Sequence, residues 1–281
     1  MKNLLSLKLI NNKVEAIEKN SFISLASLNE LDLSYNQIEY LQNGTFSGLS
    51  KLKTLNFLGN KISMIEQDAF VQLKNLNRMT LDYNDFSYLK NDIFTGLDNI
   101  LGLYFKYNNV ENIDENAFLN LVNVRDIFFN ENQIKRIQKE SFSGLKALLN
   151  LVLSNNMIER IEPYSFNQTA KISKINLDFN KLKKIFNSTF YGLSRMNVLT
   201  ITYNQIDFIE PNSFQTLASL QRLELSKNCL KNIGNETFSG LKKLFNLYLD
   251  QNEIEYIAAN SFFQLNSLKT LDLSKNNLVK I

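Results

Sequence analysis

The chain of 281 residues contains no histidine, no tryptophan, two prolines and one cysteine. Without histidine, catalytic dyads and triads that use an imidazole are excluded, and so are zinc sites of the usual cysteine–histidine kind. The single cysteine, Cys229, excludes a disulfide within the chain. The sequence has no apolar run of the roughly 18 residues that a membrane-spanning helix needs. We therefore expect no catalytic site, metal, cofactor or membrane span within this chain.

The charge is nearly balanced, with 31 basic against 28 acidic residues and a net charge of +3. Hydrophobic residues make up 44% of the chain, which is enough to build a core and excludes a disordered protein. Asparagine is unusually abundant, with 41 copies among the 281 residues. This abundance points to a special structural use of the asparagine side chain.

The sequence consists of a 24-residue repeat that starts at Leu4. The first residue of every repeat is aliphatic or methionine. The ninth residue of all twelve repeats is asparagine, from Asn12 to Asn276, and the nineteenth is phenylalanine wherever the repeat reaches it, from Phe22 to Phe262. No insertion or deletion interrupts the series, which predicts a stack of equivalent structural units.

The repeat reads LxxLxLxxNxIxxIxxxxFxxLxx and resembles the 24-residue typical class of leucine-rich repeats, found in Toll-like receptor ectodomains, Slit, chaoptin and variable lymphocyte receptors. The resemblance covers essentially the whole chain, 1–281, as a single domain. It implies an α/β solenoid, a right-handed horseshoe of twelve coils. A parallel β-sheet would line the concave side, with loops or short helical turns on the irregular convex side. Members of this family often bind ligands on the concave face.

Physical chemistry predicts the same architecture from the residues. The fourth and sixth residues of each repeat form a short apolar strand pattern of period two. One such coil cannot bury this face alone, so coils must stack and share a core. We expect the phenylalanines to fill the wide side of that core. We expect the asparagines to satisfy backbone groups where the chain leaves the strand.

A second period, twice as long, lies on top of the first. Glycine occupies the twenty-first position only in even-numbered repeats, at Gly48, Gly96, Gly144, Gly192 and Gly240. An acid occupies the fifteenth position only in odd-numbered repeats, at Glu18, Glu66, Asp114, Glu162 and Glu210, with Ala258 in the last full one. We interpret this alternation as a duplication of repeat pairs. The alternative is that two kinds of surface alternate along the convex face and that a partner recognises this alternation.

The chain begins at Met1 and stops at Ile281, in each case inside the repeat pattern. Terminal repeats of solenoids usually carry polar caps, and extracellular members of the resembling family carry cysteine-rich ones. Neither kind is recognisable here. We therefore expect a fragment of a longer protein, or a solenoid that self-associates through its uncapped ends.

The candidate ligand-binding residues are aromatic and occupy the fifth or eighth position of repeats four to nine. They are Tyr83, Tyr104, Tyr107, Phe128, Phe179 and Tyr203. Large amphipathic side chains on a rigid sheet are the usual anchors of protein interfaces, so we expect a protein or peptide ligand on the concave face. The alternative is that these aromatic residues merely suit strands and cover the neighbouring coils.

The positions expected on the concave face (3, 5, 7, 8 and 10) carry ten basic and eleven acidic residues. A groove that follows a phosphate backbone needs a basic excess, so we expect no nucleic-acid binding. Carboxylate pairs such as Asp82 with Asp85 have no base, nucleophile or glycine-rich loop beside them. Catalysis is therefore not expected.

Four sequons for N-glycosylation begin at Asn43, Asn167, Asn187 and Asn235. Three of them share the sixteenth position of even-numbered repeats, so duplication explains their alignment. They are compatible with secretion.

Together, these features predict a non-enzymatic recognition module. We expect part of an extracellular receptor or adhesion ectodomain that binds a protein ligand on its concave face. One alternative is an intracellular scaffold or adaptor of the same fold in the cytoplasm. Another is a regulatory segment attached to a catalytic domain outside this chain.

Overall fold

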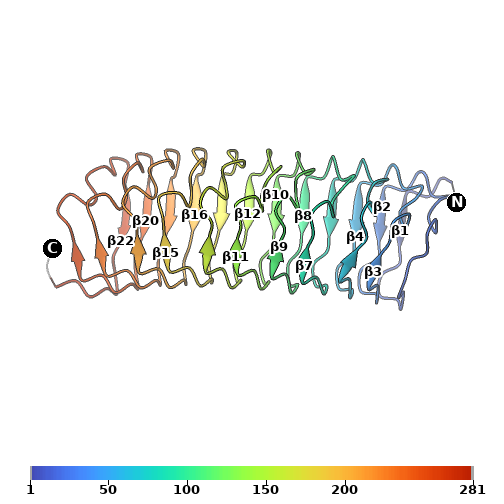
Figure 1. Ribbon diagram of the computed structural model, residues 1–281, viewed down its shortest axis with the longest axis horizontal. Helices are drawn as coiled ribbons and strands as arrows, with labels where there is room; N and C mark the ends of the chain where they lie inside the picture. Colours follow the sequence, from blue (N-terminus) through green and yellow to red (C-terminus); the bar gives the residue numbers. More distant parts are fainter. Residues whose placement is uncertain (1, 280–281) are drawn as a thin grey trace. The chain divides into compact units, whose positions relative to one another are not determined.

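The computed structural model describes residues 2–279 and contains β-strands, turns and loops over this range. It forms two compact units, Met1–Gln133 with Glu140–Leu148, and Ile134–Lys139 with Leu149–Ile281. Each unit is a solenoid of 24-residue coils, which confirms the predicted repeat architecture (Figure 1). We number the coils 1–12 and count positions from the first residue of each, Leu4 in coil 1. Across the described residues, no helix has the length and apolar character needed to span a membrane.

The main strands occupy positions 3–5 of each coil and, within each unit, pair in parallel with the strand of the next coil. In the first unit they are β1 (Ser6–Lys8), β2 (Glu30–Asp32), β4 (Thr54–Asn56), β6 (Arg78–Thr80), β8 (Gly102–Tyr104) and β10 (Asp126–Phe128). In the second unit they are β12 (Asn150–Val152), β14 (Lys174–Asn176), β16 (Val198–Thr200), β18 (Arg222–Glu224), β20 (Asn246–Tyr248) and β22 (Thr270–Asp272). Positions 4 and 6 point inward, so positions 3, 5, 7, 8 and 10 form an outward surface that we call the strand face.

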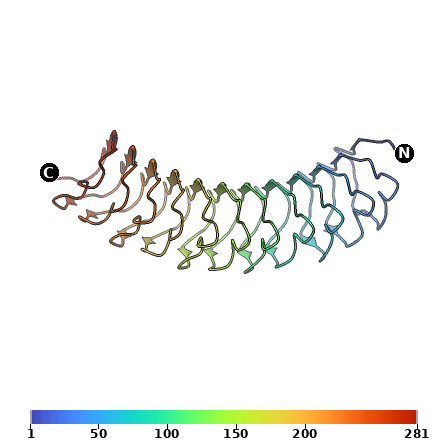
Figure 2. The ribbon, with the colours of Figure 1, turned by 90° about the horizontal axis from the view of Figure 1, so that it is seen from above.

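Two-residue strands lie at positions 13 and 14, on the side of the coils opposite the main strands (Figure 2). In the first unit, β3 (Tyr40–Leu41) pairs with β5 (Met64–Ile65), and β7 (Tyr88–Leu89) with β9 (Asn112–Ile113). In the second unit, β11 (Arg136–Ile137) pairs with β13 (Arg160–Ile161), β15 (Lys184–Ile185) with β17 (Phe208–Ile209), and β19 (Asn232–Ile233) with β21 (Tyr256–Ile257). This side therefore consists of turns and short strands over the described range, rather than the helical turns that the resemblance allowed.

The phenylalanines of position 19 form a stacked column in the core of each unit. In the first unit, Phe94 and Phe142 both stack on Phe118, with ring centroids 5.6 and 6.2 Å away. In the second unit, Phe190 stacks on Phe214 at 6.3 Å. Each such side chain contributes about 1.5–3 kcal/mol by leaving water, so the column is a principal source of stability.

The asparagines of position 9 connect neighbouring coils, as the sequence predicted. Asn132, which is 7% exposed, accepts a hydrogen bond from the backbone N–H of Val110 at 3.0 Å. Its amide nitrogen donates to the carbonyl oxygens of Phe105 and Phe129, at 2.8 and 3.1 Å. The same arrangement recurs at Asn84 and Asn228, which shows that one side chain satisfies backbone groups of two coils.

Position 8 adopts a left-handed backbone conformation in all twelve coils, with φ between 52° and 68°. The residues there are as different as Tyr203, Gly59 and Lys227, so their identities do not reveal a special backbone. A hydrogen bond between coils holds the conformation in the middle of the stack, for example from the N–H of Tyr83 to the carbonyl of Lys106 at 2.8 Å. The structure thus imposes a conformation that non-glycine residues rarely adopt alone.

The alternation between odd and even repeats corresponds to two different joints between coils. Where an even coil follows an odd one, its glycine at position 21 lies too close to the preceding backbone for a Cβ at Gly48, Gly96, Gly144 and Gly240, but not at Gly192. A Cβ added to Gly144 would lie 2.3 Å from the carbonyl oxygen of Leu119, and one added to Gly240 would lie 2.5 Å from the Cα of Gln215. At these positions, with φ near +88°, only glycine fits.

At the other joint, an odd coil follows an even one, and the acid at position 15 binds the preceding coil at Glu66, Asp114 and Glu210. Glu66 accepts a hydrogen bond from the backbone N–H of Asn43 at 2.6 Å, and Glu210 accepts one from that of Asn187 at 2.8 Å. The two-residue strands pair at this same joint. The alternation of glycine and acid therefore has a structural basis.

Candidate functional site

The six predicted aromatic residues lie on the strand face and form three stacked pairs. Tyr104 stacks on Phe128 and Tyr83 on Tyr107 in the first unit, whereas Phe179 stacks on Tyr203 in the second. Each pair joins neighbouring coils. We refer to Tyr83, Tyr104, Tyr107 and Phe128 as the aromatic cluster of the first unit.

The rings of Tyr104 and Phe128 project from β8 and β10 and are nearly parallel, 9° apart, with centroids 5.0 Å apart. Gly102 makes room for this arrangement, since a Cβ there would lie only 3.1 Å from the Tyr104 ring. The Arg78 guanidinium lies 4.5 Å from the centroid of Tyr104, and the Lys106 ammonium 5.0 Å from that of Phe128. A cationic side chain therefore lies over the face of each ring, which is a favourable cation–π arrangement.

Tyr83 and Tyr107 stand just beyond the strands, at position 8. Their ring centroids are 4.3 Å apart, and the two side chains are 52% and 44% exposed. Burial raises the pKa of Tyr83, and the neighbouring Tyr107 raises it further. Because each ring is already stacked on its neighbour, binding of a ligand here would cost the two tyrosines little side-chain entropy.

The third pair has the same character in the second unit. The rings of Phe179 and Tyr203 are 4.1 Å apart and exposed. Lys227 places its ammonium 4.0 Å from the Tyr203 ring centroid and donates a hydrogen bond to the Tyr203 hydroxyl. Lys227 thus places a positive charge beside a stacked ring of the second unit, as Arg78 and Lys106 do in the first unit.

The acids of the strand face at position 7 bind backbone groups. Asp82 accepts a hydrogen bond from the backbone N–H of Lys106 at 2.8 Å, and Asp178 accepts one from Thr202 at 2.7 Å. Partial burial raises the pKa of Asp82, although that hydrogen bond and the charges of Lys106 and Arg78 oppose the rise. Over residues 2–279, no three or more His, Cys, Asp or Glu side chains form a group suited to a metal ion.

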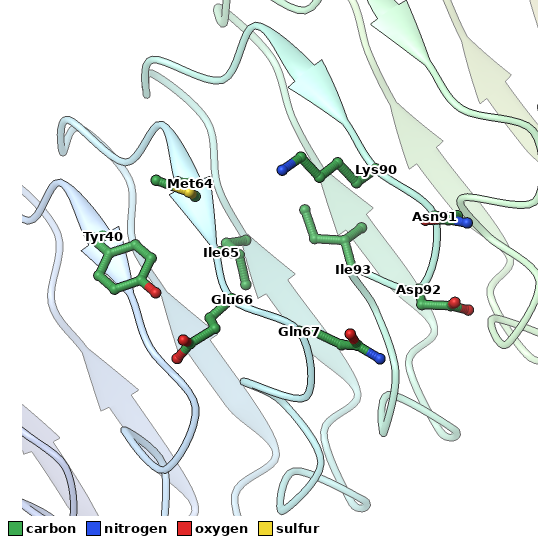
Figure 3. Close-up of a pocket in the computed structure, with 9 residues that line it drawn as sticks. All are labelled: Tyr40, Met64, Ile65, Glu66, Gln67, Lys90, Asn91, Asp92 and Ile93. Carbon is green, nitrogen blue, oxygen red and sulfur yellow. The ribbon is translucent and has the colours of Figure 1, made fainter.

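A second surface, which we call the flank, is formed by positions 12, 13, 15 and 16. In the first unit it contains a hollow of about 400 Å³ between Tyr40, Met64 and Lys90, which come from three successive coils (Figure 3). The Glu66 carboxylate at its edge is already bound to the N–H of Asn43. Burial raises the pKa of Tyr40, and Glu66 raises it further. Glu66, one of the two acids that line this hollow with Asp92, is therefore part of the coil joint.

The flank of the second unit is different, because basic side chains dominate it in coils 6–8. These are Lys135, Arg136, Lys139, Arg160, Lys183 and Lys184, all exposed. They were not predicted as a site because charges were counted only on the strand face. The adjacent pairs Lys135–Arg136 and Lys183–Lys184, at equivalent positions two coils apart, were the available signal.

The asparagines of the four sequons, Asn43, Asn167, Asn187 and Asn235, are all exposed. The threonine of each sequon is buried, Thr45 and Thr169 completely. The side chains that would carry glycans therefore point to solvent, while the threonines belong to the folded core.

Comparison with known families identifies leucine-rich repeats along the chain. A family model described as leucine rich repeat matches residues 1–38, 29–86, 170–230 and 219–278. A second model, described as a BspA type leucine rich repeat region, matches residues 65–194. No curated protein matches the chain.

Several solved structures are similar to this chain. The crystal structure of a TLR13–ssRNA13 complex has a TM-score of 0.80 and 26% identity, and covers 99% of this chain and 44% of that one. The Toll–Spatzle complex of Drosophila has a TM-score of 0.72 and 23% identity, over 93% of this chain and 38% of that one. The leucine-rich repeat domain of APL1B has a TM-score of 0.77 and 19% identity, over 98% and 78%. This chain thus spans less than half of the first two.

The expectation that nucleic acid is excluded is wrong. The TLR13 structure contains single-stranded RNA, so a similar solenoid does bind nucleic acid. The physical reason for the error is that charge was counted on one surface only. The strand face is balanced, but the flank of the second unit carries a local basic excess that a whole-chain charge of +3 conceals.

Proposed function

Because this chain belongs to the leucine-rich repeat family, we propose that it is a recognition module that binds a protein or peptide through the strand face of its first unit. The observation that carries the proposal is the aromatic cluster of the first unit. Its rings are stacked, partly exposed and fixed on a rigid sheet. Aromatic and arginine side chains in such settings supply most of the binding energy at protein interfaces.

The chemistry of the cluster favours a ligand segment with apolar side chains that lie against the rings. The rings of Tyr104 and Phe128 offer apolar area, while Arg78 and Lys106 hold positive charge beside them. Four acids of the same coils, Asp82, Asp85, Asp126 and Glu131, outnumber these two cations on the strand face, so the charge of this face does not select an acidic ligand. The second-unit pair of Phe179 and Tyr203, with Lys227, repeats this combination and would take a similar segment.

The proposal is tested with peptides selected from a displayed random library against the intact protein. We expect the double variant Tyr104→Ala with Tyr107→Ala to weaken the selected peptides at least tenfold, because hot-spot truncations cost about 2 kcal/mol or more. Affinities are measured by fluorescence anisotropy with labelled peptides.

The matched control replaces two exposed tyrosines of the flank in the same unit, Tyr40→Ala with Tyr88→Ala. Selected peptides should bind this variant with nearly unchanged affinity. If the peptides keep their affinity for the Tyr104/Tyr107 variant but lose affinity for the flank variant, the binding site does not lie on the strand face.

We further propose that the chain is part of an extracellular receptor or adhesion protein and carries glycans. The four exposed sequon asparagines support this location. Expressed with a secretory leader in animal cells, the protein should lose mass when N-linked glycans are removed enzymatically. Replacing Asn43, Asn187 and Asn235 by glutamine should remove most of that shift. A secreted protein whose mass is unaffected by the enzyme would contradict the proposal.

A further inference from the structure

The flank of the second unit concentrates positive charge in coils 6–8. Positions 12, 13, 15 and 16 of these coils hold six basic side chains and two acidic ones, Glu159 and Glu162. The same positions in coils 3–5 of the first unit hold one basic side chain, Lys90, and four acidic ones. The basic excess is therefore a local feature of one surface.

The short strands of this flank place like charges side by side. Arg136 on β11 lies directly opposite Arg160 on β13, on strands about 4.8 Å apart. Like charges in such a pair repel each other and destabilise the sheet. Glu162 binds the Arg160 guanidinium at 3.1 and 3.2 Å, and Glu159 is the one other acid at positions 12, 13, 15 and 16 of these coils, which leaves a positive excess at these positions. An anion bound across the strands would relieve the repulsion.

Exposed aromatic rings accompany these cations. Phe186 is 43% exposed and borders a hollow of about 380 Å³ that Arg160, Lys183 and Lys184 also line, together with the acid Glu159. Phe208, 45% exposed, lies opposite Lys184 on the paired strands β15 and β17. Cations for a phosphate backbone next to exposed rings for unpaired bases are the combination that binds single strands.

We propose that this basic flank binds single-stranded nucleic acid. Arg136, Lys183 and Lys184 contact the phosphates, and bases stack on Phe186 and Phe208. A sulfated polysaccharide would use the cations without needing the rings, so the rings favour a nucleic acid. The site is separate from the strand face and does not depend on the proposed protein ligand.

The test measures binding of a fluorescein-labelled 20-nucleotide thymidine strand to the intact protein by anisotropy, over a series of salt concentrations. The variant Lys183→Glu with Lys184→Glu should bind at least tenfold more weakly. The slope of log affinity against log salt should fall by about 1.4, since each phosphate contact in a single strand contributes about 0.7. The variant Phe186→Ser with Phe208→Ser should lose at least about fivefold by removing stacking.

The control is Lys242→Glu with Lys243→Glu, a second pair of adjacent exposed lysines in the same unit. It changes the net charge equally and should alter affinity less than about twofold. The variant Tyr104→Ala with Tyr107→Ala should bind the thymidine strand with unchanged affinity. This result separates the nucleic-acid site from the peptide site proposed on the strand face. Circular dichroism confirms folding, and Lys→Gln variants replace any Lys→Glu variant that fails to fold.

Three results would overturn the proposal. One is no binding of the thymidine strand at low salt. Another is an equal loss in the Lys242/Lys243 control, which would show unspecific attraction. The third is that heparin binds as tightly as the thymidine strand and that the Phe186/Phe208 change does not weaken binding of the thymidine strand. This result would indicate a polysaccharide ligand instead.

Discussion

Replacing Asn132 by alanine is expected to lower the free energy of unfolding by about 3 kcal/mol or more. The side chain is buried and bonded to backbone groups of two coils, with the N–H of Val110 as donor and the carbonyls of Phe105 and Phe129 as acceptors. Removing it leaves these groups without a partner in the core. Each unsatisfied buried polar group costs about 1–3 kcal/mol. The measurement is urea unfolding followed by circular dichroism.

The matched control is Asn12→Ala, the same position in coil 1. Asn12 is exposed, and its amide donates only within its own coil, to the carbonyls of Leu9 and Ile10. Water can replace these bonds, so the loss should stay below about 1 kcal/mol. Equal losses in the two variants would refute the idea that asparagine stabilises the stack by joining coils.

Replacing Gly144 by alanine is expected to destabilise the protein by at least about 3 kcal/mol. Its φ of +87° strains any residue with a Cβ, which costs about 1–2 kcal/mol. The new Cβ would also lie 2.3 Å from the carbonyl oxygen of Leu119, a backbone atom that cannot turn away. The neighbouring coil must therefore shift, and this shift adds to the strain.

Two other glycines separate these effects. Gly192 has a φ of +90°, but its nearest contact to an added Cβ is 3.4 Å, so Gly192→Ala should show the backbone strain alone. Gly234 has no positive φ, and its nearest contact is 3.5 Å away, so Gly234→Ala should change stability by less than about 1 kcal/mol. Urea unfolding should rank the losses as Gly144, Gly192, then Gly234. A Gly144 loss no larger than that of Gly192 would exclude close packing as the cause.

Much of the fold follows from the sequence because the repeat places the same residue types at the same depth in every coil. The 24-residue period located the strands. The asparagine column that includes Asn132 predicted the hydrogen bonds between coils, and the phenylalanine column that includes Phe118 predicted the core. The alternation of Gly144 with acids such as Glu66 was visible too, although its role at two kinds of joint was not.

The candidate sites were harder to predict. The aromatic residues could be chosen by position, but their grouping into pairs depends on contacts between one coil and the next. The stack of Tyr104 on Phe128 further depends on the space that Gly102 leaves. The basic flank was missed because its charges are scattered along the sequence and only the stacked short strands bring Arg136 and Arg160 together.

The sequence by itself determined the coil length, the strand positions, the buried columns and the identity of the exposed aromatic residues. Each of these is a local periodic property that recurs in every repeat. The tertiary structure alone decided the left-handed backbone at Tyr83 and its equivalents, the ring pairing and the charge of each flank. These features arise from hydrogen bonds, ring contacts and charges between neighbouring coils, and such contacts exist only once the coils have stacked.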